Sequence, residues 1–240
     1  MNNLLKIKTF IEGWNQIRNT DVALNFLTSG SSLIISHDEY LLWEKINPDS
    51  INCYFGVDQF ELKFYLIDNK SDENKNYRIG ENLFEKEFSR TLLLPKKYHQ
   101  TESFTPAVLS TSDSLNANKA KNRIVSWILS AEAWFEDQKT KFATSKGIVR
   151  VISIPFDDLK ALFKSSSKDI CCIFSMKNFS DENEESNYNI ELILTRTDVT
   201  LSNPLAVTLE NDTLEDPAFE DVSRPCPPFG GNLEEFTLLT

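Results

Sequence analysis

Glycine and histidine are scarce in this chain, and their scarcity argues against several kinds of site. The 240 residues include only 7 Gly and 2 His. Phosphate-binding loops need glycine where the backbone takes a positive φ or approaches the ligand closely, and neither GxxxxGK[ST] nor GxGxxG occurs. The GxSxG elbow of serine hydrolases is missing as well. Neither His37 nor His99 is therefore expected to act in catalysis, and no catalytic residue or cofactor is predicted.

Long apolar runs and an excess of basic residues are also missing. The longest apolar stretches, such as 170–174, are far shorter than the roughly 20 residues needed to span a bilayer. A net charge of −11 repels a nucleic-acid backbone. Lys6, Lys8 and Glu12 interrupt any N-terminal signal-like run. We therefore expect no membrane span, no nucleic-acid partner and a cytoplasmic protein.

The cysteine pattern agrees with that compartment. Three of the 4 cysteines, Cys53, Cys171 and Cys172, lie in apolar strand-like runs, where a thiol behaves as a small hydrophobic side chain. Cys171 and Cys172 are adjacent rather than spaced as CxxC, and neighbours on a strand point to opposite faces. Metal binding through these thiols is therefore not predicted, and only Cys226 is expected to be exposed.

Aromatic residues are what the chain has in abundance, with 17 Phe and 4 Trp. Apolar residues recur at helical spacing over 4–18 and over 116–139. Trp14, Trp127 and Trp134 fall within those apolar stripes, so we expect them in the core rather than stacked on a ligand. Ile128 is predicted to share the buried face of the second helix.

A structural unit is predicted to occur twice. Moving the sequence by 119 positions puts Cys53 on Cys172 and Asp38 on Asp157. The first copy has a strand at 33–36, a helix at 38–46 and strands at 51–57 and 60–67; the second has 148–154, 157–163, 170–176 and 189–196. Alternation over 60–67 predicts one buried face, with Lys63 and Tyr65 on the other. Residues 68–76 are predicted to be a polar loop, and 11 residues are expected to be inserted in the second hairpin.

These patterns predict an α+β fold of two pseudo-symmetric repeats, each a long helix, a strand, a short helix and an antiparallel hairpin. The first repeat spans 1–91 and the second 116–200. A Ser-, Thr- and Pro-rich linker is expected over 92–115, and an acidic, Pro-rich tail over 201–240. The pattern does not decide whether the two repeats share one sheet, nor the oligomeric state.

Three segments resemble a known family. Residues 118–127, 154–159 and 224–228 are similar to an uncharacterised family of small bacterial proteins that end in a Pro-Cys-Pro-x-x-Cys type motif. The similarity covers about 118–229. The second cysteine of that motif is absent, because Phe229 or Gly230 stands in its place, so a role that needs two tail thiols is in doubt. The resemblance implies no activity.

Two acidic pairs follow strands and begin short helices: Asp38 with Glu39, and Asp157 with Asp158. Paired carboxylates can hold a divalent cation or do acid–base chemistry. Acids at a helix N-terminus can equally cap backbone N–H groups and interact with the helix dipole. We favour capping, because the pair occurs in both predicted copies.

The Pro-rich tail is the remaining candidate. Arg224, Cys226 and Phe229 lie in a stretch that prolines should keep extended. This stretch can either dock a protein partner or pack along its own domain, and we favour packing. The sequence as a whole favours a non-catalytic interaction or scaffold protein with an unidentified protein partner. The alternative is a divalent-metal-dependent enzyme using the acidic pairs.

Overall fold

The computed structural model describes residues 3–89, 117–141, 147–165, 167–179, 187–197, 219–221, 224–226 and 235–239. Its helices are α1 (Asn3–Ile17), α2 (Asp21–Leu27), α3 (His37–Glu44), α4 (Asn69–Glu73), α5 (Ala117–Lys141), α6 (Phe156–Ser165) and the 3₁₀ turn η2 (Thr237–Leu239). Its strands are β1 (Ser32–Ile35), β2 (Ser50–Asp58), β3 (Glu61–Asp68), β4 (Leu83–Glu87), β5 (Val151–Pro155), β6 (Ile170–Phe179), β7 (Asn187–Arg196), β8 (Phe219–Asp221) and β9 (Arg224–Cys226). The predicted α+β class is confirmed. In the described ranges, no helix is long and apolar enough to cross a membrane.

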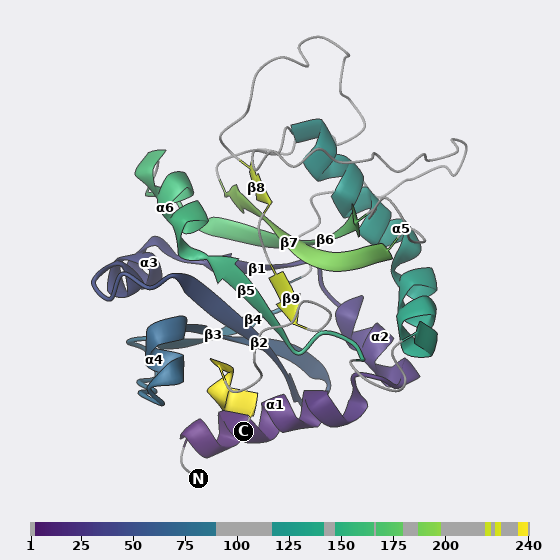
Figure 1. Cartoon of the computed structure of the whole chain (residues 1–240), viewed down its shortest axis with the longest axis horizontal. Helices are drawn as coiled ribbons and strands as arrows, with labels where there is room; N and C mark the ends of the chain where they lie inside the picture. Colours follow the sequence, from purple (N-terminus) through teal and green to yellow (C-terminus); the bar gives the residue numbers. More distant parts are fainter. Residues whose placement is uncertain are drawn as a thin grey trace.

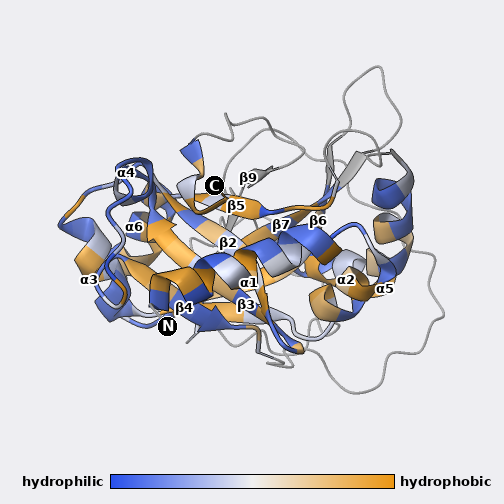
Figure 2. Ribbon diagram, turned by 90° about the horizontal axis from the view of Figure 1, so that it is seen from below, coloured by the Kyte–Doolittle hydropathy of each residue, from blue (hydrophilic) through white to orange (hydrophobic). Residues whose placement is uncertain are grey.

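The strands form two antiparallel sheets that pack face to face (Figure 1). One sheet has the order β1-β6-β7-β8 and the other β4-β3-β2-β5-β9. Aromatic side chains join them: Phe174 of β6 stacks on Phe55 of β2 with ring centres 6.0 Å apart, and meets Phe64 of β3 edge-on at 5.8 Å. The strands are mainly hydrophobic in Figure 2, whereas α1 alternates between hydrophobic and hydrophilic residues. One hydrophobic cluster therefore lies between the sheets, and a second, which includes Ile11, Tyr54 and Tyr65, lies between α1 and the second sheet.

The first strand of each predicted repeat belongs to the sheet of the other repeat. β1 pairs with β6, and β5 pairs with β2. The segments 1–91 and 116–200 thus do not form separate sheets. The hairpin register also corrects the predicted insertion: Cys53 faces Leu66 and Cys172 faces Leu194. Leu66 and Leu194 are 128 positions apart, so the second hairpin is longer by 9 residues rather than 11.

Helix α1 covers the outer face of the second sheet. Gly56 of β2 makes this possible, because a Cβ there would lie 3.2 Å from the backbone carbon of Phe10. The prediction that Lys63 and Tyr65 lie on an exposed face of β3 is therefore wrong. Tyr65 is fully buried, and Lys63 is 7% exposed with its ammonium 2.9 Å from the Glu61 carboxylate. Phe60, predicted to be buried, lies in the hairpin turn and is 89% exposed. Local alternation could not show that a helix lies on this face.

Helix α5 packs against β6 and β7 of the first sheet. Arg123 forms a buried ion pair with Glu191 of β7 at 3.1 Å, and Ser175 of β6 donates to the same carboxylate at 2.9 Å. Trp127 meets Phe174 edge-on at 5.8 Å, so the predicted core face of the helix is largely correct. Ile128 was expected on that face and is half exposed.

Two further segments differ from the sequence-based expectation. The predicted loop 68–76 contains helix α4, in which Ser71 and Asp72 are buried. The C-terminal region adds β8 to β7, β9 to β5, and η2 against α1 (Figure 1). The predicted linker 92–115 lies outside the described residues. Segments with few apolar residues therefore still form strands and a helix. Local patterns do not predict them, because the residues that they contact are distant in sequence.

Candidate functional site

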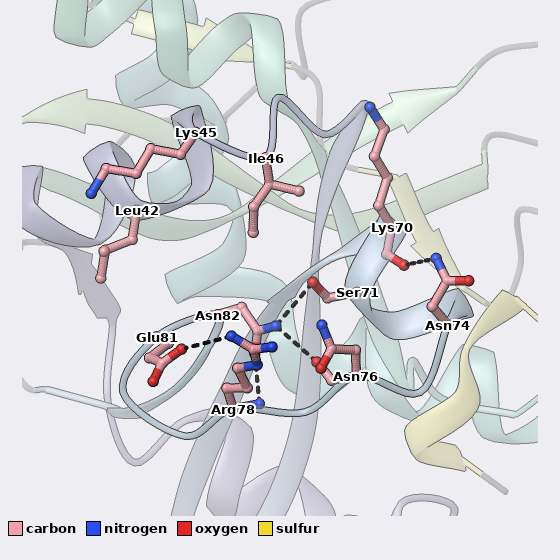
Figure 3. Close-up of a pocket in the computed structure, with 10 residues that line it drawn as sticks. All are labelled: Leu42, Lys45, Ile46, Lys70, Ser71, Asn74, Asn76, Arg78, Glu81 and Asn82. Carbon is pink, nitrogen blue, oxygen red and sulfur yellow. Dashed lines mark hydrogen bonds and ion pairs between the residues drawn. The ribbon is translucent and has the colours of Figure 1, made fainter.

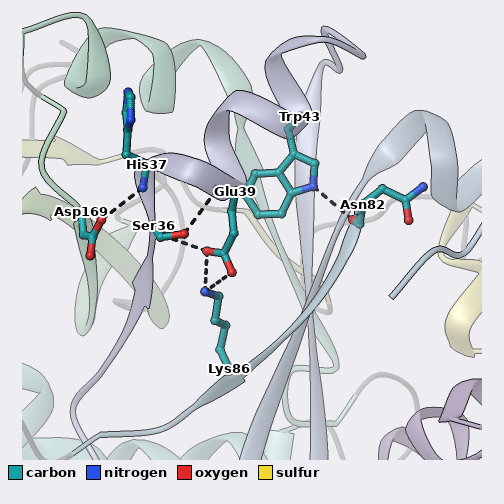
Figure 4. Close-up of polar contacts among 7 residues, drawn as sticks. All are labelled: Ser36, His37, Glu39, Trp43, Asn82, Lys86 and Asp169. Atoms are coloured by element: carbon teal, nitrogen blue, oxygen red, sulfur yellow. Dashed lines mark hydrogen bonds and ion pairs between the residues drawn. The ribbon is translucent and has the colours of Figure 1, made fainter. Parts of the chain in front are cut away.

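Glu39 of the first acidic pair helps to cap α3 (Figure 4). The N-cap is Ser36 rather than Asp38: its hydroxyl accepts the Glu39 N–H at 3.3 Å, and the Glu39 carboxylate accepts the Ser36 N–H at 2.8 Å. This reciprocal arrangement is a capping box. Both Glu39 oxygens also accept hydrogen bonds from the Lys86 ammonium. Asp38 is exposed in the first turn of the helix. Glu39 thus already has a cationic partner.

The second acidic pair has a similar position on α6. Asp157 is exposed and forms an ion pair with Lys160, one turn further along the helix, at 3.0 Å. Asp158 is partly buried in the first turn. Across the described residues, no three His, Cys, Asp or Glu side chains come together as a group that could hold a metal ion.

His37 lies among aromatic rings. Its ring centre is 5.4 Å from that of Phe163, and its backbone N–H donates to Asp169 at 3.2 Å. Tyr40, one turn further along α3, stacks on Phe163 at 4.4 Å and donates its hydroxyl to Glu44 at 2.6 Å. Burial and that hydrogen bond raise the pKa of Tyr40 to about 12. These contacts join α3 to α6 and serve packing.

The cysteines, the tryptophans and the tail can also be placed. Cys53, Cys171 and Cys172 are buried free thiols, and burial raises the pKa of each. The three tryptophans expected in the core are buried there. Arg224–Cys226 form strand β9, in which Cys226 faces Val151. The backbone of this stretch is thus paired with its own domain, and Phe229 lies outside the described residues.

A surface pocket of about 530 Å³ lies between α3, α4 and the loop 76–82 (Figure 3). We call it the α3–α4 pocket. Its lining residues come from three separate segments and are Leu42, Lys45, Ile46, Lys70, Ser71, Asn74, Asn76, Arg78, Glu81 and Asn82. Its volume is within the range of ordinary small-ligand sites.

Buried Asn82 fixes the base of this pocket. Its side-chain amide donates to the Ser71 hydroxyl at 2.9 Å and to the Asn76 carbonyl at 2.8 Å, and its amide oxygen accepts the Arg78 N–H at 2.8 Å. The Asn82 carbonyl accepts the indole N–H of Trp43 from α3 at 3.1 Å (Figure 4). These bonds tie the loop to both helices, so the pocket is preorganised.

Helix α4 is held from behind by a buried carboxylate. Asp72 is fully buried and accepts hydrogen bonds from Asn52 at 2.8 Å and from the Tyr54 hydroxyl. Thr237 of η2 donates to the Asp72 carboxylate at 2.8 Å or to its carbonyl at 2.7 Å, and Tyr77 bonds to the same hydroxyl. Burial raises the pKa of Asp72, although the hydrogen bonds act in the opposite direction. The C-terminal turn therefore helps to position the helix that lines the pocket.

The charge of the pocket is opposite to that of the chain. Lys45, Lys70 and Arg78 line it with only Glu81 as a carboxylate, whereas the chain carries −11 overall. The Lys70 ammonium donates at 2.7 Å to the carbonyl of Asn47, in the turn that follows α3. Arg78 pairs with Glu81 at 3.4 Å, but both side chains are more than half exposed, so the pair is weak.

The three cations are spread apart rather than focused on one point. In Figure 3 the ammonium groups of Lys45 and Lys70 point to opposite sides of the pocket, and the Arg78 guanidinium lies nearer the middle. Partly buried Leu42 and Ile46 provide an apolar surface between them. Such spacing suits an extended ligand with several acidic groups better than a single compact anion.

The sequence alone did not reveal this pocket. Its residues are distributed over about forty positions, and none belongs to a recognisable motif. One signal was present: four of the 14 residues in 69–82 are asparagine, a residue type that favours turns and local side-chain hydrogen bonds.

Comparisons with known proteins give no relative for this chain. No family model, no curated protein and no solved structure matches it. The resemblance to the small bacterial family with the Pro-Cys-Pro-x-x-Cys type motif therefore stays a prediction.

Proposed function

We propose that this protein is a non-catalytic interaction module that binds an acidic segment of a partner protein in the α3–α4 pocket. The observation that carries the proposal is the set of three spaced cations, Lys45, Lys70 and Arg78, around an apolar surface on a strongly acidic chain. Acidic side chains of the partner would meet these cations, and an apolar residue between them would contact Leu42 and Ile46. Arginine and lysine clusters recognise acidic peptides in this way in other proteins.

The fixed base of the pocket supports ligand binding without a conformational change in the pocket. Asn82 and its partners Ser71 and Trp43 are buried, so their geometry is set before any ligand arrives. A preformed surface loses less conformational entropy on binding than one that must be ordered. The cations at the rim are exposed and add attraction over a longer range, which raises the association rate more than the affinity.

Fluorescence anisotropy with a short fluorescein-labelled peptide of Glu, Asp and Leu tests the proposal. The Lys45→Glu/Arg78→Glu variant should weaken binding by about tenfold, since each reversal replaces an attraction by a repulsion. Lys70 is kept because its ammonium also bonds to the carbonyl of Asn47, in the turn that follows α3.

The matched control is Lys6→Glu/Lys164→Glu, which changes the net charge equally at exposed lysines away from the residues that line the pocket. This control should bind the peptide nearly as well as the unchanged chain. A peptide with Lys in place of its acids should not bind. Equal losses in the two double variants would show that only the overall charge matters and would reject the pocket as the binding site.

A further inference from the structure

The exchange of first strands follows the same register in both halves of the chain. Leu33 of β1 faces Cys172 of β6, and 119 residues further along Ile152 of β5 faces Cys53 of β2. In the same way Ile35 faces Ile170, and Ile154 faces Ile51; these residues are fully buried. A one-residue slip in either pair would move buried side chains to the opposite face of the strand. The burial of these side chains therefore fixes the register of each strand pair.

The elements that follow each first strand also correspond. α3 follows β1 and α6 follows β5, and the two short helices meet through Tyr40, which stacks on Phe156 at 5.6 Å. Each then leads into an antiparallel hairpin, β2 with β3 and β6 with β7. A further strand lies beside the second strand of each hairpin: β4 beside β3, and β8 beside β7.

We infer that the two halves of this chain are each other's binding partners, built as two copies of one unit that have exchanged their first strands. The contact between them is then an interaction surface whose partner is a copy of the same kind of unit. Exchange of an identical element is a common low-cost way for two copies to associate. The strand pairs that carry the contact lie outside 90–116, the stretch that joins the halves in sequence.

The energetics of the exchanged strands support this inference. β5 lies inside its sheet between β2 and β9, so its loss would leave the edge of β2 unpaired. It would also remove the buried side chains of Val151, Ile152 and Ile154 from the core. Neither half can complete its sheet alone, and each supplies the strand that the other lacks. Cutting the connection should therefore leave the two halves bound to each other.

The test uses the full chain with a specific protease site inserted between Ser103 and Phe104. After cleavage, we expect the two fragments to co-elute in size-exclusion chromatography at the position of the uncut chain, with an unchanged circular-dichroism spectrum. Elution as two separate species, folded or unfolded, would overturn the inference.

A cross-link identifies the strand pair in the same cleaved protein. Directly opposed residues on antiparallel strands lie within reach of a disulfide, so Leu33→Cys should form one with native Cys172 on mild oxidation. A non-reducing gel should then show one band at the mass of the uncut chain, and a reducing gel two bands. Leu33→Cys with Cys172→Ala is the control and should give two bands on both gels. Two bands for Leu33→Cys without reductant would contradict the exchanged pairing.

Discussion

Replacement of Thr237 by valine tests whether the C-terminal turn is held by the buried Asp72 carboxylate. The change keeps the shape of the side chain and removes its hydroxyl. That hydroxyl donates to Asp72, at 2.8 Å to the carboxylate or 2.7 Å to the carbonyl, and bonds to Tyr77. Asp72 is fully buried and Thr237 is 5% exposed, so water cannot readily replace the lost donor.

The expected cost follows from these contacts. A hydrogen bond to a charged group contributes about 1.5–3 kcal/mol, and an unsatisfied buried group adds to the loss. We therefore expect Thr237→Val to lower the free energy of unfolding by about 2–3 kcal/mol in urea denaturation. Thr237→Ser keeps the hydroxyl and loses one methyl group, so it should cost about 1 kcal/mol.

The difference between the two variants is the decisive quantity. If valine and serine at position 237 cost the same, the hydroxyl does not hold the turn, and the role assigned to Asp72 is wrong. Limited proteolysis near the C-terminus provides a local readout. Loss of the hydrogen bond between Thr237 and Asp72 should expose 235–239 to cleavage before the rest of the chain unfolds.

Three further predictions concern charge. Arg123→Met should lower the free energy of unfolding by about 3–5 kcal/mol because it leaves the buried Glu191 carboxylate without its cationic partner. Arg123→Met/Glu191→Leu should cost clearly less, because it removes the buried charge, although the Ser175 hydroxyl then loses its acceptor. Equal costs in urea denaturation would contradict the buried pair. Because burial raises the pKa of Asp72 above its ordinary 3.8, this group should make the chain less stable as pH rises from that value through the raised pKa, and Asp72→Asn should remove that part of the slope in denaturation measured at several pH values. An Asp72→Asn profile parallel to that of the unchanged chain would contradict it. Mg²⁺ or Mn²⁺ should leave the melting temperature unchanged, and a rise that is lost in Asp157→Asn/Asp158→Asn would instead support the metal-dependent alternative.

Local periodicity identified most of the apolar elements. The helix at 4–18 and the strands at 51–57 and 60–67 correspond to α1, β2 and β3 within a few residues, because their apolar spacing is regular. The same reasoning missed α4, which has no apolar residue to reveal its period and is fixed by Asp72 and its partners. A polar segment can be well ordered when its hydrogen-bond partners come from elsewhere in the chain.

The pairing of strands and the pocket depend on contacts that no local pattern contains. The sequence predicted the strands, but only the registers of β1 with β6 and of β5 with β2 show which strands pair across the chain. Tyr65 and Lys63 were expected on an exposed face because alternation cannot report the helix that covers it. For the same reason the sequence predicts a candidate site at the adjacent acidic pairs, but not at the cations of the α3–α4 pocket, which lie far apart in sequence.

The most direct test of the proposed function is a titration of the ¹⁵N-labelled chain with the acidic Glu, Asp and Leu peptide, followed by NMR. We expect chemical-shift changes concentrated at the backbone amides of Lys45, Ile46 and 76–82 and at the side-chain amides of Asn74 and Asn76. Amides on α1 and α5, which lie on other faces, should not shift. Saturating peptide that leaves the pocket residues unshifted, or that shifts another face instead, would contradict the account.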